Sequence, residues 1–311
     1  SFKVDRSSIR QGNAVIAIKD VSDAILWSWH VWVTDEDINN VIEITNHQNV
    51  KYNFMPVNLG QCDGNTITYE ERSCKVKFIA GDQSKEITIK QLANVIATGS
   101  NAPFYQWGRK DPLYPSNGMG NTTKIWYDKE GIPSTANPMK GTFSAGNDCI
   151  KNCILNPNLM HNRYNGDYTY YNLWSADNKT TSANDNPVNK TIYDPCPVGF
   201  KLPASNAFTG FTTTGESVSS STQVNGTWSS SEKGWYFYTN SEKTQSIFFP
   251  ALGYRSYSTM RPGSIGTQGC FWSAHPVAKG NNYYLRTSSV DVQPTYMVDR
   301  GFGYALRPCQ D

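Results

Sequence analysis

The stretch "CFWSAHPVAKGNNYYL", residues 270–285, is the part of the sequence that decides the fold. It opens on an apolar run ending in Trp-Ser, passes through a short link with a charge and a glycine, and closes on aromatic residues. A near-copy stands upstream, "TWSSSEKGWYFY", residues 227–238. Short runs rich in aromatic residues and bounded by Gly, Ser, Asn or Pro are typical of strands. Each stretch therefore predicts short strands joined by a turn.

Further runs of the same kind surround these two stretches. They are "SIFFPALGYR" (246–255), "YYLRTSSVDV" (283–292) and "FGYALRP" (302–308). Gly, Ser, Asn and Pro separate them, so the last third predicts an antiparallel sheet. The preceding segment "KTIYDPCPVGFKLPAS" (190–205) holds three prolines, which exclude a regular element through its whole length. We interpret it as a rigid lead-in to the sheet.

The first third also predicts strands. Residues 13–18, "NAVIAI", and 25–33, "ILWSWHVWV", are apolar, and the second alternates with a period of two. Its tryptophans are expected in the core, with His30 among them as a hydrogen-bonded structural residue. "ITYEERSCKVKFIAGD" (67–82) predicts an extended pair with a turn at Gly81-Asp82. Ile89, Leu92, Ala93 and Ile96 follow helical spacing ahead of Gly99, which predicts a helix.

Composition narrows the class of protein. The 311 residues carry a net charge of +2 without a basic run, so nucleic acid is not expected as a partner. The sequence has no run of 18 apolar residues, so direct membrane insertion is not expected either. Aromatic residues reach 13% among abundant Gly, Asn, Ser and Thr, which favours a loop-rich extracytoplasmic protein. Residues 108–148 and 156–190 are predicted as long loops, which often carry binding functions.

The seven cysteines show no zinc-type spacing. In an oxidising compartment disulfides are expected, with Cys62–Cys74 across a turn and Cys196–Cys309 tying the last strand to the body as the candidate pairs. The pair in "DCIKNC", Cys149 and Cys153, is interpreted as structural or disulfide-forming. A reactive role is disfavoured because no basic cluster stands nearby in the sequence.

Motifs for catalysis are missing from the sequence. It contains no GxSxG, HExxH, Walker or GxGxxG pattern in the required context, and its four histidines are far apart. "TDEDINN" (34–40) lacks the alternating oxygen ligands of a calcium loop and is interpreted as a solvated acidic loop. We therefore expect no enzyme activity, no metal and no cofactor. Tyr, Trp, Asn, Ser and Gly are instead the residues of adaptable recognition surfaces.

An ordered series of motifs resembles a known family. "GNAVIAIKDVSDAILWSWHVWVTD", "MPVNLG", "FYQWGRKDP", "IYDPCPVGFKLP", "WSSS", "ALGYR", "FWSA", "YYL" and "GFGYALRP" follow the order seen in C-terminal domains of Bacteroidales fimbrillin-like cell-surface proteins. The series also resembles the Fibrobacter succinogenes major paralogous domain. One departure is "MPVNLGQCDG", where such domains commonly read "MDRNLGA". The resemblance covers residues 12–309.

The resemblance implies an α+β, C-type-lectin-like fold with a twisted antiparallel sheet, few helices and long ordered loops. Residues 13–311 would form the ligand-binding domain, and residues 1–12 would end a preceding domain or linker. The two Trp-Ser stretches would be core strands, and "YALRPC" the closing strand. The segment from Trp272 to Arg307 is similar to the variable region of diversity-generating-retroelement proteins. Glu-Pro-Asn and Trp-Asn-Asp, the calcium motifs of lectins, are missing, so calcium-dependent sugar binding is not implied.

By this resemblance the protein is expected to be a non-enzymatic adhesin on a bacterial outer-membrane surface or pilus, binding a protein or a glycan and contacting other pilus subunits. A structural pilin subunit and a formylglycine-generating-type enzyme using Cys270 are the alternatives. Ligand contacts are predicted between the Trp-Ser strands and the closing strand, where the resembling fold presents its outward face. The predicted residues are Trp235, Tyr236, His275, Asn281, Asn282, Tyr296 and Asp299. Tyr283, Tyr284 and Leu285 are expected to pack inward.

Overall fold

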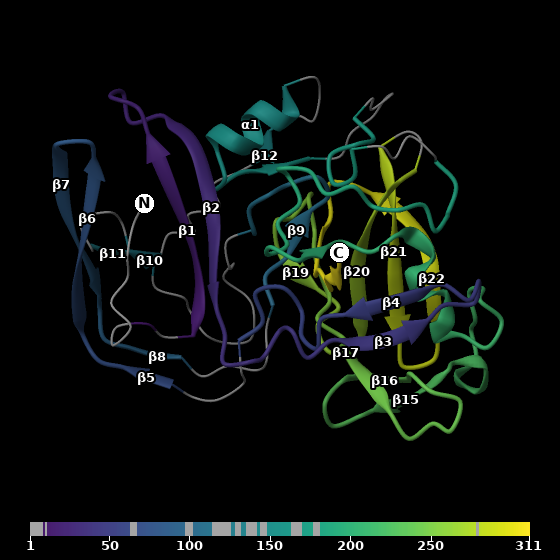
Figure 1. Cartoon of the computed structure of the whole chain (residues 1–311). Helices are drawn as coiled ribbons and strands as arrows, with labels where there is room; N and C mark the ends of the chain where they lie inside the picture. Colours follow the sequence, from purple (N-terminus) through teal and green to yellow (C-terminus); the bar gives the residue numbers. More distant parts are fainter. Residues whose placement is uncertain are drawn as a thin grey trace.

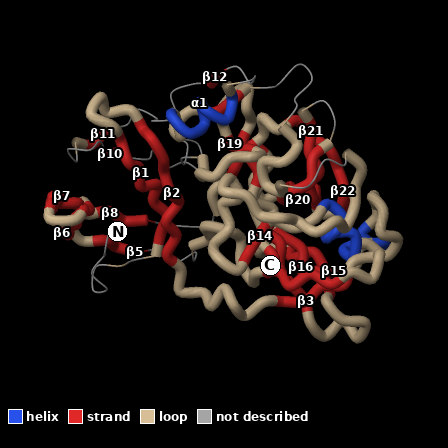
Figure 2. The backbone as a smooth tube through the Cα atoms, turned by 45° about the horizontal axis from the view of Figure 1, so that its top comes forward, coloured by secondary structure: helices blue, strands red, loops and turns tan. Residues whose placement is uncertain are grey.

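The chain folds into mostly antiparallel β-sheets with few helices, which confirms the β-rich class predicted from the sequence (Figures 1 and 2). The computed structural model describes residues 9, 11–62, 67–96, 102–113, 126–127, 132–134, 142–143, 148–162, 170–176, 181–277 and 280–311. Helical structure in these ranges is limited to α1 (Cys149–Leu155) and the 3-10 helices η2 (Ser205–Phe211) and η3 (Ser221–Gln223).

The stretch 270–285 contributes to two neighbouring strands of a three-stranded sheet. Its strands are β20 (Gln268–Pro276), β21 (Asn281–Ser288) and β22 (Val292–Asp299), paired antiparallel in that order. Trp272 lies opposite Tyr284, and Tyr284 lies opposite Tyr296. Trp272, Tyr283, Tyr284 and Leu285 are buried, which confirms their inward packing. Aromatic side chains on neighbouring strands thus make the sheet a wall of the core.

The upstream near-copy forms a second hairpin in a separate sheet. Its strands are β15 (Gly226–Ser229), β16 (Gly234–Tyr238) and β17 (Ser246–Pro250), also antiparallel in that order. Trp228 lies opposite Trp235. Since side chains alternate along a strand, Trp235 and Phe237 enter the core whereas Tyr236 stays partly exposed. Both Trp-Ser stretches therefore supply buried aromatic side chains to the core, each from a different sheet.

Two four-stranded sheets join distant parts of the chain. The first has the order β14 (Phe200–Lys201), β24 (Cys309–Gln310), β4 (Lys51–Phe54) and β3 (Ile42–Thr45). The second has the order β19 (Pro262–Gly263), β18 (Tyr254–Arg255), β23 (Gly303–Tyr304) and β9 (Tyr105–Gln106). The last strand thus pairs with an early one, Cys309 lying opposite Phe54. These short pairings join the C-terminal strands to residues 42–54 and 105–106.

The buried residues form two clusters. One surrounds Phe249 and contains Phe54, Phe208, Phe211, Phe237 and Phe271. The other contains Trp107, Trp174, Trp272, Tyr284 and Tyr304. Strand β20 contributes to both, because Phe271 and Trp272 point to opposite faces of it. The sheet at residues 268–299 is therefore the wall between the two cores.

Two-stranded sheets lie beside this body, at the left of Figure 1. They are β1 (Gly12–Lys19) with β2 (Ile25–Val33), β5 (Ile67–Tyr69) with β8 (Asn94–Ile96), β6 (Arg72–Ala80) with β7 (Gln83–Gln91), and β10 (Trp126–Tyr127) with β11 (Pro133–Ser134). The strands predicted over 13–18 and 25–33 are confirmed, as is the turn at Gly81-Asp82. The parallel pair β12 (Thr142–Phe143) and β13 (Met160–His161) lies within the predicted loops.

Two sequence predictions in this part are wrong. The predicted helix through Ile89 does not form, because β7 continues to Gln91 and Ile89 pairs with Cys74 across the β6–β7 ladder. The alternation of Ile87 and Ile89 fits a strand, and cross-strand pairing outweighs the helical spacing. Trp29 is 48% exposed instead of buried. Gly99 lies outside the described residues.

His30 confirms its predicted structural role. Its Nε2 donates to the Asn13 side-chain oxygen at 2.8 Å, and its Nδ1 accepts from the Tyr105 hydroxyl at 2.8 Å. Burial lowers the pKa of His30 to about 4, so the imidazole is neutral at pH 7. The ring therefore fixes β2 against the body of the molecule.

Candidate functional site

Tyr296 is the predicted ligand contact that the structure leaves most accessible. It lies on the edge strand β22 and is 44% exposed. The Tyr284 ring meets it edge-on with centroids 5.7 Å apart, and the Arg286 guanidinium carbon lies 5.8 Å from its ring centroid. An exposed aromatic ring held by two neighbours loses little conformational entropy when a ligand covers it.

Polar side chains on the same hairpin hold Arg286 in place. Its Nη1 donates to the Gln293 side-chain oxygen at 3.1 Å and lies 3.4 Å from the Asp291 carboxylate. We call Arg286, Asp291, Gln293 and Tyr296 the Tyr296 patch. The patch combines an aromatic face with a cation, an anion and an amide, all at least partly exposed. Such a combination suits recognition by stacking and hydrogen bonding.

Tyr236 lies on the outer face of another sheet. Its ring packs against Phe248 on β17, with centroids 4.7 Å apart, and its hydroxyl donates to Glu232 at 2.7 Å. Both rings are partly exposed. Asn281, the first residue of β21, is also partly exposed and lies opposite Asp299. Tyr236 and Tyr296 therefore belong to different sheets.

Four predicted contacts are buried, and their expected outward position is wrong. Trp235 donates its ring N–H to the Ser288 carbonyl at 2.7 Å and packs in the core. Asn282 donates to the His275 carbonyl at 3.0 Å, which fixes the end of the β20–β21 pair. Asp299 accepts the Gly301 N–H at 2.7 Å. His275 is fully buried. Their polarity satisfies the backbone inside the fold instead of facing solvent.

His275 makes folding sensitive to acid. Its Nδ1 accepts the Ser205 N–H at 3.2 Å, so a proton added there would face another donor. Burial lowers the pKa of His275 to about 4, below the ordinary value near 6.5. Because the unfolded state takes up the proton first, stability is complete above pH 6.5 and is lost as the pH falls towards 4.

We therefore predict that His275 alone removes about 2 kcal/mol of the free energy of unfolding between pH 7.5 and pH 5. Urea unfolding at both pH values would measure this, and the His275→Gln variant should lose that much less than the wild type. The same substitution at the exposed His47 is the control. Parallel pH dependences for wild type and His275→Gln would refute the assignment.

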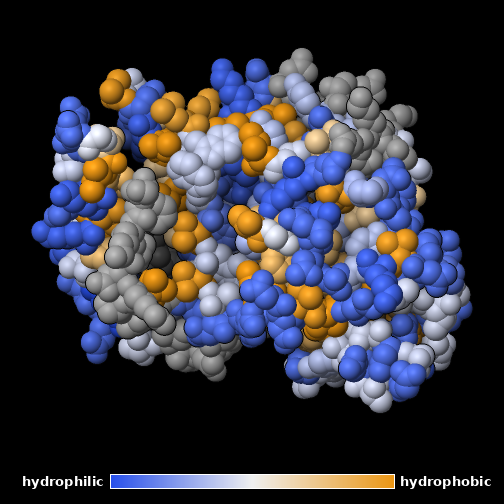
Figure 3. Space-filling model, in the orientation of Figure 1, coloured by the Kyte–Doolittle hydropathy of each residue, from blue (hydrophilic) through white to orange (hydrophobic). Residues whose placement is uncertain are grey.

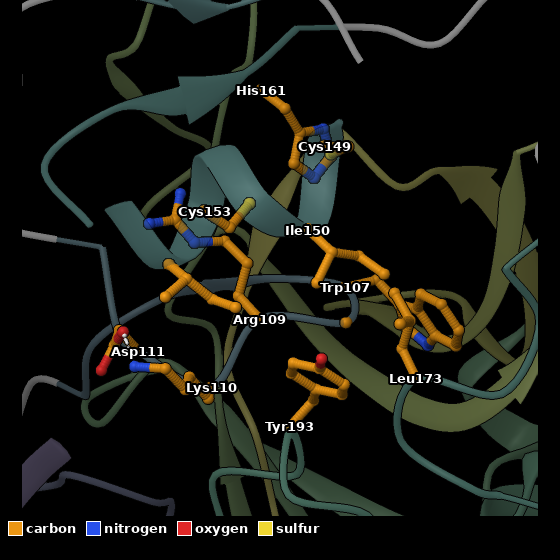
Figure 4. A pocket seen from close by; sticks show the side chains of 12 residues that line it. Trp107, Arg109, Lys110, Asp111, Cys149, Ile150, Cys153, His161, Leu173 and Tyr193 are labelled. Carbon is orange, nitrogen blue, oxygen red and sulfur yellow. Dashed lines mark hydrogen bonds and ion pairs between the residues drawn. The ribbon is translucent and has the colours of Figure 1, made fainter. Parts of the chain in front are cut away.

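A hollow beneath α1 is the second candidate site (Figure 4). It has a volume of about 360 Å³ including its open mouth. The lining residues include Arg109, Lys110 and Asp111 from the loop after β9, Cys149 and Cys153 from α1, and His161 from β13. Sequence reasoning missed this site, because "GRKDP" has the composition of a solvated turn. The burial of three adjacent charged side chains becomes visible only in the fold.

Two of the three charged side chains in the hollow, Lys110 and Asp111, form an ion pair. Lys110 Nζ lies 2.5 Å from Asp111 Oδ2 and 2.8 Å from the Ser28 carbonyl oxygen, and 4.5 Å from the Trp27 ring centroid. Burial lowers the pKa of Lys110, while Asp111 opposes that shift. Among the described residues, Asp111 Oδ1 and Arg109 Nε have no hydrogen-bond partner. These two atoms, one acceptor and one donor, belong to residues that line the hollow.

The hollow does not present an activated nucleophile. A hydrogen bond with Cys149 and burial raise the pKa of the Cys153 thiol well above 9, although Arg109 opposes the shift. Burial and then Arg109 lower the pKa of His161 to about 3, which keeps this imidazole neutral. Because thiol chemistry requires the thiolate, neither residue is set for rapid catalysis at neutral pH. The arrangement suits slow thiol exchange and polar binding better than turnover.

The structure contains seven free thiols, so the predicted disulfides Cys62–Cys74 and Cys196–Cys309 are not formed in it. The Cys196 thiol is hydrogen-bonded to the Asp194 carboxylate, which also accepts the Cys196 N–H at 2.8 Å. Cys309 lies in β24, opposite Lys201 and Phe54. Cys62 lies 3.8 Å from the Gly60 carbonyl oxygen. The structure thus gives the surroundings of Cys62, Cys196 and Cys309, and each of the three is a free thiol.

Comparisons with protein-family models, with curated proteins and with solved structures find no match to this chain. Within the described ranges, no helix has the length and apolar character needed to cross a membrane.

Proposed function

We propose that this protein is a non-enzymatic ligand-binding module of a bacterial cell surface or pilus, and that it recognises a protein or glycan through the Tyr296 patch. The observation that carries the proposal is the Tyr296 ring itself, accessible on an edge strand and supported by Tyr284 and Arg286. Aromatic rings supply contact area at low entropic cost, and they also stack on the apolar faces of sugars.

A C-type-lectin-like fold is part of this proposal. The β-rich architecture supports it, as do the three-stranded sheet β20–β22 and the pairing of the last strand β24 with β4. In such a fold the sheet provides a rigid base while loops and edge strands vary. Tyr296 and Gln293 of the patch lie on the edge strand β22, which is separated from β20 by β21, so these two side chains can change without disturbing the buried residues of β20.

The enzyme alternative rests on Cys270, and its surroundings count against it. Cys270 is buried in β20, and burial raises the pKa of its thiol to about 12. A thiol with so high a pKa is a poor nucleophile at neutral pH.

The structural-subunit alternative rests on a different observation. Phe78, Ile87 and Ile89 on the β6–β7 hairpin are large, apolar and exposed, and Figure 3 shows apolar residues among the hydrophilic ones on this side of the molecule. A subunit packed in an assembly would cover such a face. This alternative predicts self-association of the chain instead of binding at Tyr296.

The Tyr296→Ala variant tests the proposal. The wild type is first screened on a printed glycan array and an array of immobilised extracellular proteins. For the ligand found, we expect Tyr296→Ala to weaken binding by about 2 kcal/mol, or roughly thirtyfold in Kd, as hot-spot residues do. The neighbouring Met297, which is 52% exposed on the opposite face of β22, provides the matched control. Met297→Ala should bind like the wild type.

Thermal unfolding of the same variants separates binding from folding. Because Tyr296 is on the surface, Tyr296→Ala should keep a Tm close to that of the wild type. A large loss of thermal stability with unchanged ligand binding would show that Tyr296 supports the fold and would reject the patch as the binding site. Equal losses of binding in Tyr296→Ala and Met297→Ala would reject it as well.

A further inference from the structure

Two cysteines lie together on one face of α1. Cys149 and Cys153 are one helical turn apart, and both line the hollow beneath the helix (Figure 4). Their thiols are hydrogen-bond partners. Cys149 is buried and Cys153 is partly exposed. This arrangement places the two sulfurs side by side at the hollow, with Cys153 the more exposed of the two residues.

We propose that Cys149 and Cys153 form a dithiol–disulfide site that a small disulfide of the glutathione class closes and a thiol of the same class reopens. The site is separate from the Tyr296 patch, and its chemistry does not depend on ligand binding there. It adds a covalent modification to a part of the molecule that the proposed recognition function leaves without a role.

The helix brings the two residues close to disulfide geometry. Positions four apart on an α-helix have Cα atoms about 6 Å apart, inside the 4.4–6.8 Å range of disulfides. Their Cβ atoms, about 5–6 Å apart in a regular helix, must approach to about 4 Å. Helix α1 can yield this much, because it is only seven residues long and no side-chain hydrogen bond caps it at Asp148. Closing the disulfide should tighten or partly unwind this single short helix.

The exchange proceeds in two balanced steps. Cys153 loses its proton, and its sulfur attacks one sulfur of oxidised glutathione, which breaks that disulfide and releases one glutathione thiolate that takes up a proton. The Cys149 sulfur, deprotonated in turn, attacks the Cys153 sulfur of the mixed disulfide and releases the second glutathione. Two cysteine thiols are oxidised and one glutathione disulfide is reduced to two thiols. The Arg109 cation, which favours the Cys153 thiolate, lies beside this reaction.

Three other described cysteines, Cys196, Cys270 and Cys309, lack this combination because all three are buried. Cys270 and Cys309 are enclosed in strands β20 and β24, and Cys196 is bound to Asp194. Their positions leave no room for a glutathione-sized reagent without opening the core. Cys270 and Cys309 therefore serve as internal controls within the same molecule.

A redox titration of the full chain tests the proposal. The folded protein is equilibrated in buffers with increasing ratios of oxidised to reduced glutathione, quenched with acid, denatured, alkylated and digested with trypsin. Cleavage after Lys140, Lys151 and Arg163 places the two cysteines on separate peptides, 141–151 and 152–163. We expect these two peptides to become joined as the oxidised fraction rises, and to separate again after reduction. Cys270 and Cys309 should carry the alkyl label at every ratio, because they remain thiols throughout.

Single replacements give the second measurement. In Cys149→Ser, Cys153 should keep a bound glutathione that cannot be resolved, so the mixed disulfide should accumulate. Circular dichroism of each sample checks that the chain is folded. The proposal is overturned if both peptides carry the alkyl label in folded wild type at the most oxidising ratio, or if Cys153 becomes joined to a cysteine other than Cys149.

Discussion

Replacing Arg307 with alanine is expected to lower the free energy of unfolding by about 3–5 kcal/mol. Arg307 is buried at the closing strand, and its guanidinium donates to the Asn58 side-chain oxygen at 2.7 Å, to the Pro56 carbonyl at 2.8 Å and to the Phe248 carbonyl at 2.7 Å. Removing the guanidinium leaves these buried acceptors without donors. The Arg307→Lys variant should also be destabilised, because an ammonium cannot span three acceptors on two separate segments.

The surroundings of Arg307 explain why its loss is costly in spite of its own desolvation. Burial lowers the pKa of Arg307 to about 9, which means that loss of water disfavours the charged form of its guanidinium. The Phe249 ring, 4.4 Å from the guanidinium carbon, and the hydrogen bonds compensate for that loss. Unfolding in guanidinium chloride, followed by tryptophan fluorescence, would measure the loss of stability. The Arg261→Ala variant, which changes an exposed arginine, is the control. Equal stabilities of Arg307→Ala and Arg261→Ala would contradict the role given to Arg307.

Replacing Phe249 with alanine should cost a similar amount, about 3–5 kcal/mol. Phe249 is fully buried at the centre of the first core cluster. Its ring has five aromatic neighbours, with centroid distances of 4.9 Å to Phe271, 5.0 Å to Phe211, 5.8 Å to Phe237, 6.2 Å to Phe54 and 6.3 Å to Phe208. These neighbours belong to three strands and a 3-10 helix, which cannot all move to fill the cavity.

Phe248, the residue directly before Phe249, provides a matched control. Phe248 has the same side chain on the same strand, but it points to the outer face, where it is partly exposed beside Tyr236. Phe248→Ala should therefore cost about 1 kcal/mol, the loss of one aromatic pair. Urea unfolding of the two variants under identical conditions compares them directly. If Phe248→Ala were as destabilising as Phe249→Ala, the inward and outward faces of β17 would be assigned wrongly.

Local patterns predicted much of the strand content. The alternation in "ILWSWHVWV" and the aromatic runs of the last third correspond to β2, β16, β17, β20 and β21. Gly81 adopts a positive φ of 59° in the predicted turn. The helix predicted through Ile89 is wrong, because a helical spacing of four apolar residues coexists there with the two-residue alternation of Ile87 and Ile89. Pairing with β6 decided between them, and a pairing partner is not a property of the segment itself.

The candidate site was predicted less completely than the strands. Tyr236, Asn281 and Tyr296 remain accessible, whereas Trp235, His275, Asn282 and Asp299 have polar atoms that serve the interior. Residue type could not separate these groups, since an Asn or a His is equally suited to bind a ligand or a buried backbone group. The convergence of Arg109, Cys153 and His161 on one hollow joins segments about fifty residues apart, and no local pattern encodes such a meeting.

By itself, the sequence determined the β-rich class, the two Trp-Ser hairpins and the turns between strands, because these depend on side-chain alternation and on residues next to each other in the chain. Only the tertiary structure decided which aromatic residues are buried, which strands pair across the chain, and that the cysteines of "DCIKNC" meet buried charges. Burial depends on what covers a face. The pairing of β24 with β4, and of β7 with β6, is selected by the total burial that the whole chain achieves, which no single segment specifies.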